Sequence, residues 1–567
     1  MRVLKIKNSY TKSIEPFEPL DERKKSVTIY SCGPTVYSYA HIGNFRSFLF
    51  ADVLRRVLEQ HGYAVRQVMN VTDVGHLTQD HLADAEGEDR LSKAARELGK
   101  DPYAVAAHFE AAFVRDAKLL RLKNHQPPDA DDPSLHPRAT AYVAEMLVMI
   151  DTLIERGFAY VVPSGEVYFE VSKFPEYGRL SGKVLDELEA GARVAVRDEK
   201  KDPRDFALWK VDHKHLMNWD PHGPTGWPEG DYARFQKLAP NGVDRRIGKG
   251  FPGWHIECSA MSRALLGDAI DVHTGGEDNV FPHHECEIAQ SFGATGAGTH
   301  APPGSPDDGA IRKSFARYWV HGRHLLVDGR KMAKRDGTFF TVHDFLDPRS
   351  SGRPELVERL VEAGFSSGSV PPRVLRYALI SNAYTQPMNF TFDLLGQAKA
   401  SVERLQSRYD RLREQAGEGA PRAEVTALLQ AKGGAFDRAL DDDLNMPNAL
   451  AAVFELVTAL NHLELSPGEA REALALFERI DGVLDVFDRT VDGGVVTHAD
   501  IAARIAAIDD QPIPETLDLQ AIERAIVQRA AKKKARAFAE ADAIREQLKA
   551  RGVLIEDTSA GVRWKIV

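Results

Sequence analysis

The chain contains very little cysteine: Cys32, Cys258 and Cys286 are the only three among 567 residues. So few cysteines argue against a disulfide framework and favour a reducing, cytoplasmic compartment. No stretch has the roughly 20 consecutive apolar residues that a membrane-spanning helix needs, and residues 1–8 mix charged with apolar side chains. We therefore expect no membrane partner and no secretory signal. Each cysteine becomes a candidate for metal binding or chemistry.

An excess of positive charge is also lacking. The chain has 83 acidic residues against 73 lysines and arginines, which gives a net charge of −10. Any contact with RNA must therefore come from a local basic face, because no global positive field attracts nucleic acid. The apolar and charged fractions are ordinary for a globular protein, and the length suits three or four domains.

What the sequence does contain is a strand, loop and helix pattern near its start. Residues 27–31 predict a buried strand, which is followed by Cys32-Gly-Pro, by His41-Ile-Gly-Asn44 and by a helical pattern. A helix that begins after a glycine-bearing loop presents free N–H groups and the positive end of its dipole, which attract phosphate. His41 adds donors to that site, and Gly43 permits close approach of a substrate. Taken alone, a surface-loop histidine and a buried apolar cysteine are the simpler interpretation.

The alternation of strands and helices continues along the first half of the chain. A second strand over residues 65–71 predicts a parallel nucleotide-binding sheet. A helix is expected over about 139–156. Residues 172–250 are rich in turns, and so long an irregular stretch is typical of a functional insertion. Further strands are expected at 253–258 and 269–273.

The second half predicts helices and a small final unit. Apolar stripes with charged opposite faces run from about 389 to 488, which indicates a helix bundle. Residues 489–517 resemble a linker. From residue 518, two helical segments and a short hairpin follow. The expected fold class is α/β, with a parallel-sheet domain, an all-α bundle and a small mixed α/β domain at the end.

Candidate metal ligands gather in the segment Phe281-Pro-His-His-Glu-Cys-Glu287. Its first histidine and last glutamate are four residues apart and would share one face of a helix. With Cys32 and Cys258, the second placed near the end of a strand, they would make a zinc site of two cysteines, one histidine and one glutamate. A solvated helix start is the alternative. Spacing alone does not choose among His283, His284, Cys286 and Glu287.

Two further motifs suit a nucleotide. His273-Thr-Gly-Gly-Glu-Asp278 places two glycines and a carboxylate just after a strand, although a capped turn would explain it as well. Lys331-Met-Ala-Lys334 follows an apolar segment and could neutralise phosphate charge. As a bare lysine-rich turn it would be solvated surface.

Together these motifs resemble the class I cysteinyl-tRNA synthetases, over nearly the whole chain and in the same order. The resemblance implies a Rossmann-like catalytic domain and a ligase that converts L-cysteine and ATP to cysteinyl-adenylate, then transfers cysteine to the 3′ end of tRNA(Cys). It implies one Zn²⁺ per chain and Mg²⁺ with ATP, and we expect a monomer. The implied domains are a catalytic domain at 1–345 with an insertion at about 122–250, a stem-contact or linker region at 346–400, a helical bundle at 401–495 and an anticodon-binding domain at 518–567.

The resemblance also assigns roles to single residues. The catalytic residues would be His41 and Lys334. ATP would be bound by Gly43, Asn44, Asp278, Lys331 and Lys334. Thr72 and Trp254 would shape the amino-acid pocket. The zinc ligands would be Cys32, Cys258, His283 and Glu287, which leaves Cys286 as a non-ligand.

The chain departs from the family pattern at two places. Ala333 and Arg335 stand where the mobile Lys-Met-Ser-Lys-Ser loop has serines, so two hydroxyl contacts are lost and one cation is added. The segment 73–80 lacks the acidic run that many members carry, and we assign no role there to Gly75 or His76.

A zinc ion would solve the problem of choosing cysteine over serine. Shape alone rejects a hydroxyl-bearing near-isostere only about 10²-fold, whereas protein synthesis needs roughly 10⁴. The missing factor corresponds to about 2.7 kcal/mol. A bond between zinc and the substrate thiolate would supply it, because zinc binds sulfur well and deprotonates a coordinating thiol.

A basic run at 524–536 precedes an aromatic and acidic segment near the end of the chain. A solvated helical face is the alternative for such a run. Lysines would position RNA through its phosphates, and an aromatic ring with an aspartate would read bases. By resemblance, Lys533, Phe538 and Asp542 would contact the anticodon.

Three rival functions remain open. A related ligase joins cysteine to an amino sugar in mycothiol synthesis and should not need residues 518–567. A catalytically silent tRNA-binding paralogue would tolerate the altered lysine loop. A purely structural zinc protein would not explain the two phosphate motifs.

Overall fold

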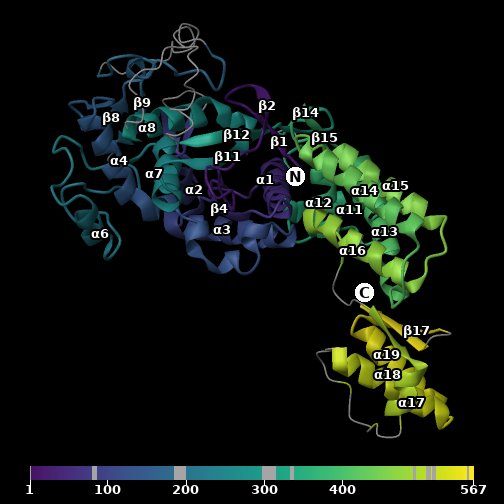
Figure 1. The fold of residues 1–567 in the computed structure, drawn as a ribbon. Coiled ribbons are helices and arrows are strands. Elements are labelled where there is room, and N and C mark those ends of the chain that lie inside the picture. Colours follow the sequence, from purple (N-terminus) through teal and green to yellow (C-terminus); the bar gives the residue numbers. More distant parts are fainter. Residues whose placement is uncertain are drawn as a thin grey trace. The chain divides into compact units, whose positions relative to one another are not determined.

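The computed structural model describes residues 2–79, 86–183, 199–212, 214–295, 315–332, 337–488, 493–505, 508, 513, 519–558 and 561–566. Contacts divide the chain into two units, Met1–Val486 and Phe487–Val567 (Figure 1). The four domain boundaries expected from the sequence stay a prediction. No helix in the described ranges is both long enough and apolar enough to cross a membrane.

A four-stranded parallel sheet forms the centre of the first unit. Its strands are β3 (Ser26–Ser31), β4 (Ala64–Met69), β11 (Ile270–Gly276) and β12 (Ala316–Gly322), in the order β12-β11-β3-β4. Helix α1 (Ile42–Gln60) makes the crossover between β3 and β4. The predicted parallel sheet is therefore confirmed. Chain order reverses between β3 and β11, and the carboxyl ends of strands at such a point are where α/β folds bind ligands.

The insertion between the two halves of this sheet has its own antiparallel sheet. Its strands lie in the order β10 (Phe251–Pro252), β9 (Phe206–Lys210), β8 (Val167–Phe169) and β7 (Ala159–Val161). Helix α4 (Val143–Glu155) packs beside it. Residues 172–250, which the sequence predicts to be irregular, thus contain one strand of this sheet, β9. Its strands are only two to five residues long, which makes their two-residue period hard to detect.

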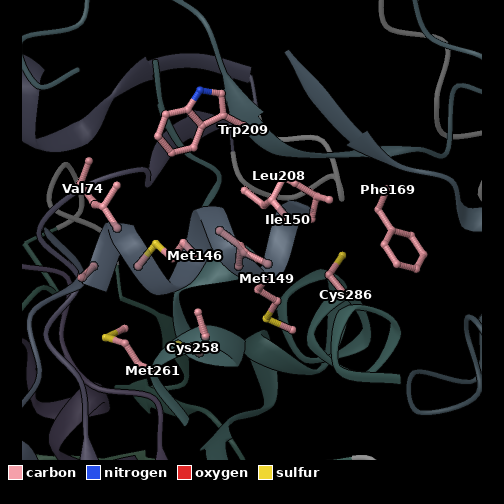
Figure 2. Close-up of a cluster of buried hydrophobic side chains, with 14 of the residues drawn as sticks. Val74, Met146, Met149, Ile150, Phe169, Leu208, Trp209, Cys258, Met261 and Cys286 are labelled. Atoms are coloured by element: carbon pink, nitrogen blue, oxygen red, sulfur yellow. The ribbon is translucent and has the colours of Figure 1, made fainter. Parts of the chain in front are cut away.

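Apolar side chains connect the insertion to the helices that carry the site residues. Figure 2 shows Met146, Met149 and Ile150 of α4 between Leu208 and Trp209 on one side and Cys258 and Met261 on the other. All of them belong to one buried cluster. The insertion therefore packs directly against helix α7 (Trp254–Leu266), which bears Cys258.

The strand expected at 253–258 is wrong, because this segment is the start of α7. Trp254, Ile256 and Cys258 alternate with polar residues as a strand would. However, the intervening His255 and Glu257 are buried as well. A helix buried on several sides loses the 3.6-residue pattern that would identify it.

The rest of the first unit is mainly helical. Helices α2 (Arg90–Leu98) and α3 (Pro102–Leu119) follow the first half of the sheet, and α8 (Glu285–Thr295) follows β11. Other α-helices among the described residues of this unit are α6 (Asp231–Leu238), α10 (Val342–Leu346), α11 (Glu355–Glu362), α12 (Pro372–Ile380), α13 (Phe392–Gln415), α14 (Ala423–Asp441), α15 (Met446–Asn461) and α16 (Pro467–Leu484). The last four make the bundle that the sequence predicts. Small sheets are completed by β1 (Lys5–Asn8), β2 (Ser13–Pro16), β5 (Leu77–Gln79), β6 (Glu86–Asp89), β13 (Leu325–Val327), β14 (Arg330–Lys331) and β15 (Met388–Phe390).

The second unit has a core of its own around Ile526, Leu548 and Trp564. It contains β16 (Gly493–Thr497), α17 (His498–Arg504), α18 (Leu519–Lys534), α19 (Phe538–Ala550), β17 (Val553–Thr558) and β18 (Gly561–Ile566). The predicted hairpin is β17 with β18. The interpretation of 489–517 as a linker is wrong for 493–504, because β16 pairs with β18 far along the chain. A local pattern does not reveal such a partner.

Candidate functional site

A cleft of about 610 Å³ opens where β3 and β11 end. Its lining includes Cys32, His41, Gly43, Asn44, Thr72, His76, Trp254, Cys258, Asp278, His283 and Lys331. The cleft thus brings together predicted residues from the metal, amino-acid and nucleotide sets. Residues 333–336, with the predicted Lys334 and the departures Ala333 and Arg335, lie outside the described residues.

The four predicted metal ligands converge at the bottom of this cleft: three line it, and the fully buried Glu287 lies behind them. The ligand atoms of Cys32, Cys258, His283 and Glu287 all lie within 4.8 Å of one another. Cys32 follows β3, Cys258 lies on α7, and Glu287 lies on α8, one turn beyond His283. Two cysteine sulfurs, one imidazole nitrogen and one carboxylate oxygen suit a tetrahedral zinc ion.

The buried Glu287 provides a test of that fit. Nε2 of His283 approaches its Oε1 at 3.1 Å, and Nε2 of His273 approaches its Oε2 at 2.8 Å. Even so, neither oxygen makes a hydrogen bond of good geometry to any described residue. A fully buried carboxylate is costly unless positive charge or hydrogen bonds balance it, and a metal ion between the four ligand atoms would do so together with the two histidines. The residues present therefore fit a metal ion.

Burial also sets the protonation of the two cysteines. It raises the pKa of the Cys258 thiol well above the usual value and raises that of Cys32 as well. Although burial opposes the charge, His273 and His283 hold the pKa of Glu287 well below its usual range. A metal ion that displaced the thiol protons would make metal affinity depend on pH.

Sequence reasoning missed a layer of histidines behind these ligands. Nε2 of His284 lies 3.2 Å from Sγ of Cys32, and Nδ1 of His284 lies 2.7 Å from Nε2 of His321. Nδ1 of His255 lies 3.1 Å from Nδ1 of His283. Cys32, His273 and His284 form a second set within ligand distance. These residues are far apart in sequence, so only the fold reveals the layer.

Cys286 lies elsewhere on α8. Its sulfur is 3.3 Å from Oη of Tyr177, and it belongs to neither ligand set found among the described residues. Two adjacent histidines, by contrast, face the cluster from different sides, since His283 contacts Glu287 and His284 contacts Cys32.

Thr72 and Trp254, which the family resemblance places at the amino-acid pocket, both line the cleft, and so does His76. Oγ1 of Thr72 donates to Oε2 of Glu257 at 3.0 Å. The ring of Trp254 stacks on His76 and on His283, with centroids 4.3 Å apart in both pairs. His76, to which the sequence assigned no role, is thus part of the pocket wall. A lone histidine after an atypical segment gave no signal of this.

His41, Gly43 and Asn44, which the sequence assigns to a phosphate site, line the cleft at the start of α1. His41 caps this helix: its Nδ1 accepts from the backbone N–H of Asn44, whose Oδ1 accepts from the N–H of His41, both at 3.1 Å. Burial lowers the pKa of His41 to about 4. A Cβ on Gly43 would lie 2.5 Å from Cε of Met332, so a larger residue here would displace the end of that flexible side chain. Neutral His41 therefore retains Nε2–H as a donor.

The residues expected to contact an anticodon lie in the second unit. Phe538 is 60% exposed at the start of α19, and Asp542 is exposed one turn later on the same helix. Nζ of Lys533 forms an ion pair with Asp557 at 2.7 Å. The exposed pair Phe538 and Asp542 shares one helix face, since i,i+4 residues are neighbours.

Comparison with known proteins agrees with this geometry. A family model described as tRNA synthetases class I (C) catalytic domain matches residues 17–233 and 229–355, and the DALR domain model matches 435–488. The cysteine–tRNA ligase of Salinibacter ruber is 38% identical and covers 99% of this chain and 98% of its own length. That of Symbiobacterium thermophilum is 39% identical and covers 99% of both chains.

A solved structure is similar in fold. The LeuRS of Agrobacterium radiobacter K84, in a ternary complex with tRNA and LeuAMS, matches with a TM-score of 0.51 at 12% identity, over 83% of this chain and 85% of its own. This confirms the Rossmann-like catalytic fold of class I. With relatives above 35% identity over nearly the whole chain, the chain belongs to the cysteine–tRNA ligase family of class I tRNA synthetases.

Proposed function

We propose that this chain activates L-cysteine with ATP to cysteinyl-adenylate and transfers cysteine to the 3′ end of tRNA(Cys). The observation that supports the proposal is the convergence of the ligand atoms of Cys32, Cys258, His283 and Glu287 within 4.8 Å. The first three of these residues line the same cleft as His41 and Asp278. A sulfur-selective site next to a phosphate site suits activation of cysteine better than any other amino acid.

Activation requires positioning rather than a protein nucleophile. The cysteine carboxylate attacks the α-phosphorus of ATP in line, and pyrophosphate leaves. Nε2–H of His41 and the free N–H groups of α1 donate to the phosphates, while Asp278 orients the adenosine. Lys331 and Lys334 balance the charge that develops on pyrophosphate. Fixed donors of this kind stabilise a transition state by about 2.7–4 kcal/mol each, and orientation adds several more.

The metal would be held by Cys32, Cys258, His283 and Glu287. Zinc bound there would take up the substrate thiolate and so select cysteine over serine. The protein side of the pocket completes the fit: Trp254 and His76 form one wall, and Thr72, tied to Glu257, another. A separate editing activity is then unnecessary.

Transfer follows in the same cleft. A ribose hydroxyl of the terminal adenosine attacks the carbonyl carbon of the adenylate, the ester bond forms, and AMP leaves with the electrons of the broken C–O bond. The second unit would bind the anticodon through Lys533, Phe538 and Asp542. Magnesium would accompany ATP, and we expect a cytoplasmic monomer.

Two assays test the proposal. Cysteine-dependent exchange of pyrophosphate into ATP measures activation, and charging of tRNA(Cys) measures the complete reaction. We expect both activities with cysteine and neither with serine. Exchange without charging would favour the amino-sugar ligase. Loss of both activities would favour the silent paralogue.

The role of the second unit has its own test. Phe538→Ala should weaken charging 5- to 150-fold, the effect of losing about one stacked base, and should leave exchange unchanged. Leu554→Ala, another exposed apolar residue of this unit, is the matched control. Equal losses of exchange and charging would contradict the assignment.

A further inference from the structure

Tyr39 is an exposed aromatic residue at the active cleft for which neither the family motifs nor the proposed chemistry accounts. It lies in the loop between β3 and α1, two residues before His41, and lines the cleft while 41% of its surface remains exposed. A single exposed apolar residue needs no explanation by itself. This ring does need one, because it lies in the cleft and is held there by specific contacts.

Helix α3 holds the ring in place. Phe109 packs against it in a T-shaped arrangement, with centroids 5.0 Å apart and an interplanar angle of 89°. Oη of Tyr39 lies 3.2 Å from Nε2 of His108. His108 in turn packs on Phe109 at 5.1 Å. His108 and Phe109 both meet the ring in T-shaped arrangements, and 41% of Tyr39 stays exposed at the cleft, so part of the ring is accessible in a fixed orientation.

A fixed and accessible aromatic face in a cleft for nucleotides suits a stacked base. Base–aromatic stacking is tolerant of sequence and strong relative to the exposed area involved. Two adenines enter this cleft in the proposed reaction, one from ATP and one from the end of the RNA. The two sources share the same ring chemistry, so the position of Tyr39 must distinguish them.

Tyr39 approaches the cleft from the side of α3. Among the described residues, its ring contacts are to His108 and Phe109 of that helix. Asn44 and Asp278, two of the residues expected to bind ATP, line the same cleft from the start of α1 and from the segment after β11. This difference favours the adenine of the RNA, and separate assays of exchange and transfer distinguish the two sources.

We propose that Tyr39 is the platform on which the terminal adenine of the acceptor RNA stacks while its ribose reaches the adenylate. This inference rests on the proposed function and extends it by naming a binding residue for the RNA end. Tyr39 forms no bond in the reaction. It lowers the free energy of the transfer complex by stacking, and its hydroxyl serves to orient the ring through His108.

The test separates activation from transfer. Tyr39→Ala and Tyr39→Phe are compared in the full chain, with Tyr103→Ala as matched control. Tyr103 is 44% exposed on α3, the helix that Tyr39 contacts, but is not part of the cleft lining. Single-turnover transfer from preformed cysteinyl-adenylate should fall 5- to 150-fold in Tyr39→Ala. It should change less than about threefold in Tyr39→Phe and Tyr103→Ala, since one neutral hydrogen bond at a partly exposed site contributes little.

A direct readout follows the base itself. tRNA ending in 2-aminopurine should lose fluorescence on binding the wild type and Tyr39→Phe, and keep it with Tyr39→Ala. Unchanged transfer and unchanged fluorescence in Tyr39→Ala would overturn the inference. So would a raised KM for ATP in exchange with normal transfer, because the base would then belong to ATP. Failure of the wild type in exchange would instead contradict the proposed function.

Discussion

Nδ1 of His41 accepts a hydrogen bond from the backbone N–H of Asn44 at 3.1 Å, which assigns the proton of the neutral ring to Nε2. The same contact caps helix α1. Because burial lowers the pKa of His41 to about 4, the ring is neutral at physiological pH. In the proposed reaction it would therefore act as an oriented donor to the phosphates and not as a permanent cation.

Removing this donor should slow activation. His41→Ala should lower kcat for cysteine-dependent exchange by about 10²–10³, the effect of losing one fixed donor to a developing charge. Asn44→Ala keeps the backbone N–H that donates to Nδ1 of His41 but removes the Oδ1 that accepts from the N–H of His41, so it should have a smaller effect in the same direction. Exchange kinetics measure both, with Tyr103→Ala as control. A His41→Ala enzyme within threefold of the wild type would contradict this role.

The pH dependence of activation should lack a contribution from His41 near neutrality. Its pKa of about 4 in the folded protein lies below the ordinary value of 6.5, so the neutral ring persists from pH 8 down to well below pH 6. In the same way, its contribution to stability is present above pH 6.5 and is lost as the pH falls through 4. A limb near pH 6.5 in the exchange profile that disappears in His41→Gln would contradict this prediction.

Cys258 and Cys286 should differ sharply in metal binding, although both are buried. Cys258→Ala removes a ligand from the cluster and should reduce zinc content well below one per chain, with loss of cysteine-dependent exchange. Cys286→Ala should retain full zinc content, because its sulfur is not in the cluster. Metal analysis of the purified proteins gives the answer, and equal zinc loss in both variants would contradict the ligand assignment.

Arg376 should be essential for stability. It is fully buried and donates to Asp52 of α1 at 2.6 Å. It also donates to the carbonyl oxygens of Leu484 at 2.6 Å and of Leu120 at 2.9 Å. Arg376 thereby connects α12 to α1 and to the end of α16. Arg376→Leu should destabilise the first unit by about 3–5 kcal/mol, because buried Asp52 loses a partner. Arg471→Leu, whose ion pair is exposed, should cost less than about 1 kcal/mol. Thermal unfolding midpoints distinguish the two.

Asp73 should make stability depend on pH. Burial raises its pKa from 3.8 to about 6 despite hydrogen bonds from Thr140. Since the folded pKa lies above the unfolded one, its favourable contribution is complete below pH 3.8 and is lost as the pH rises through 6. Asp73→Asn should therefore gain about 3 kcal/mol relative to the wild type between pH 4 and pH 7. Unfolding midpoints of both proteins at several pH values measure this difference, and a constant difference would contradict it.

Sequence patterns predicted those helices and strands whose formation depends on neighbouring residues in the chain. The alternation of strands and helices located β3, α1 and β4, and the helical periodicity located α13 to α16. The nature of α7 was missed because its buried polar residues, His255 and Glu257, disguise the helical period. Strand β16 was missed because its partner β18 lies more than 60 residues away.

In the candidate site, too, sequence patterns located some residues, and only the fold revealed others. Ligand types and family motifs located Cys32, Cys258, His283 and Glu287, whose convergence the fold supplies. The histidine layer and the stacking of His76 on Trp254 depend on contacts between distant segments, as in the 2.7 Å approach of His284 to His321. No spacing rule in the chain predicts them. The roles assigned to Lys334 and to the anticodon residues stay predictions.

The most direct measurement is the absorption spectrum of the cobalt-substituted protein on addition of substrate. Co²⁺ accepts the same ligands as Zn²⁺ and reports each thiolate that joins it as a charge-transfer band. The account predicts that the wild type already shows bands from Cys32 and Cys258, and that cysteine intensifies them whereas serine does not. A protein that takes up no cobalt, or a spectrum that cysteine and serine change equally, would contradict selection through sulfur.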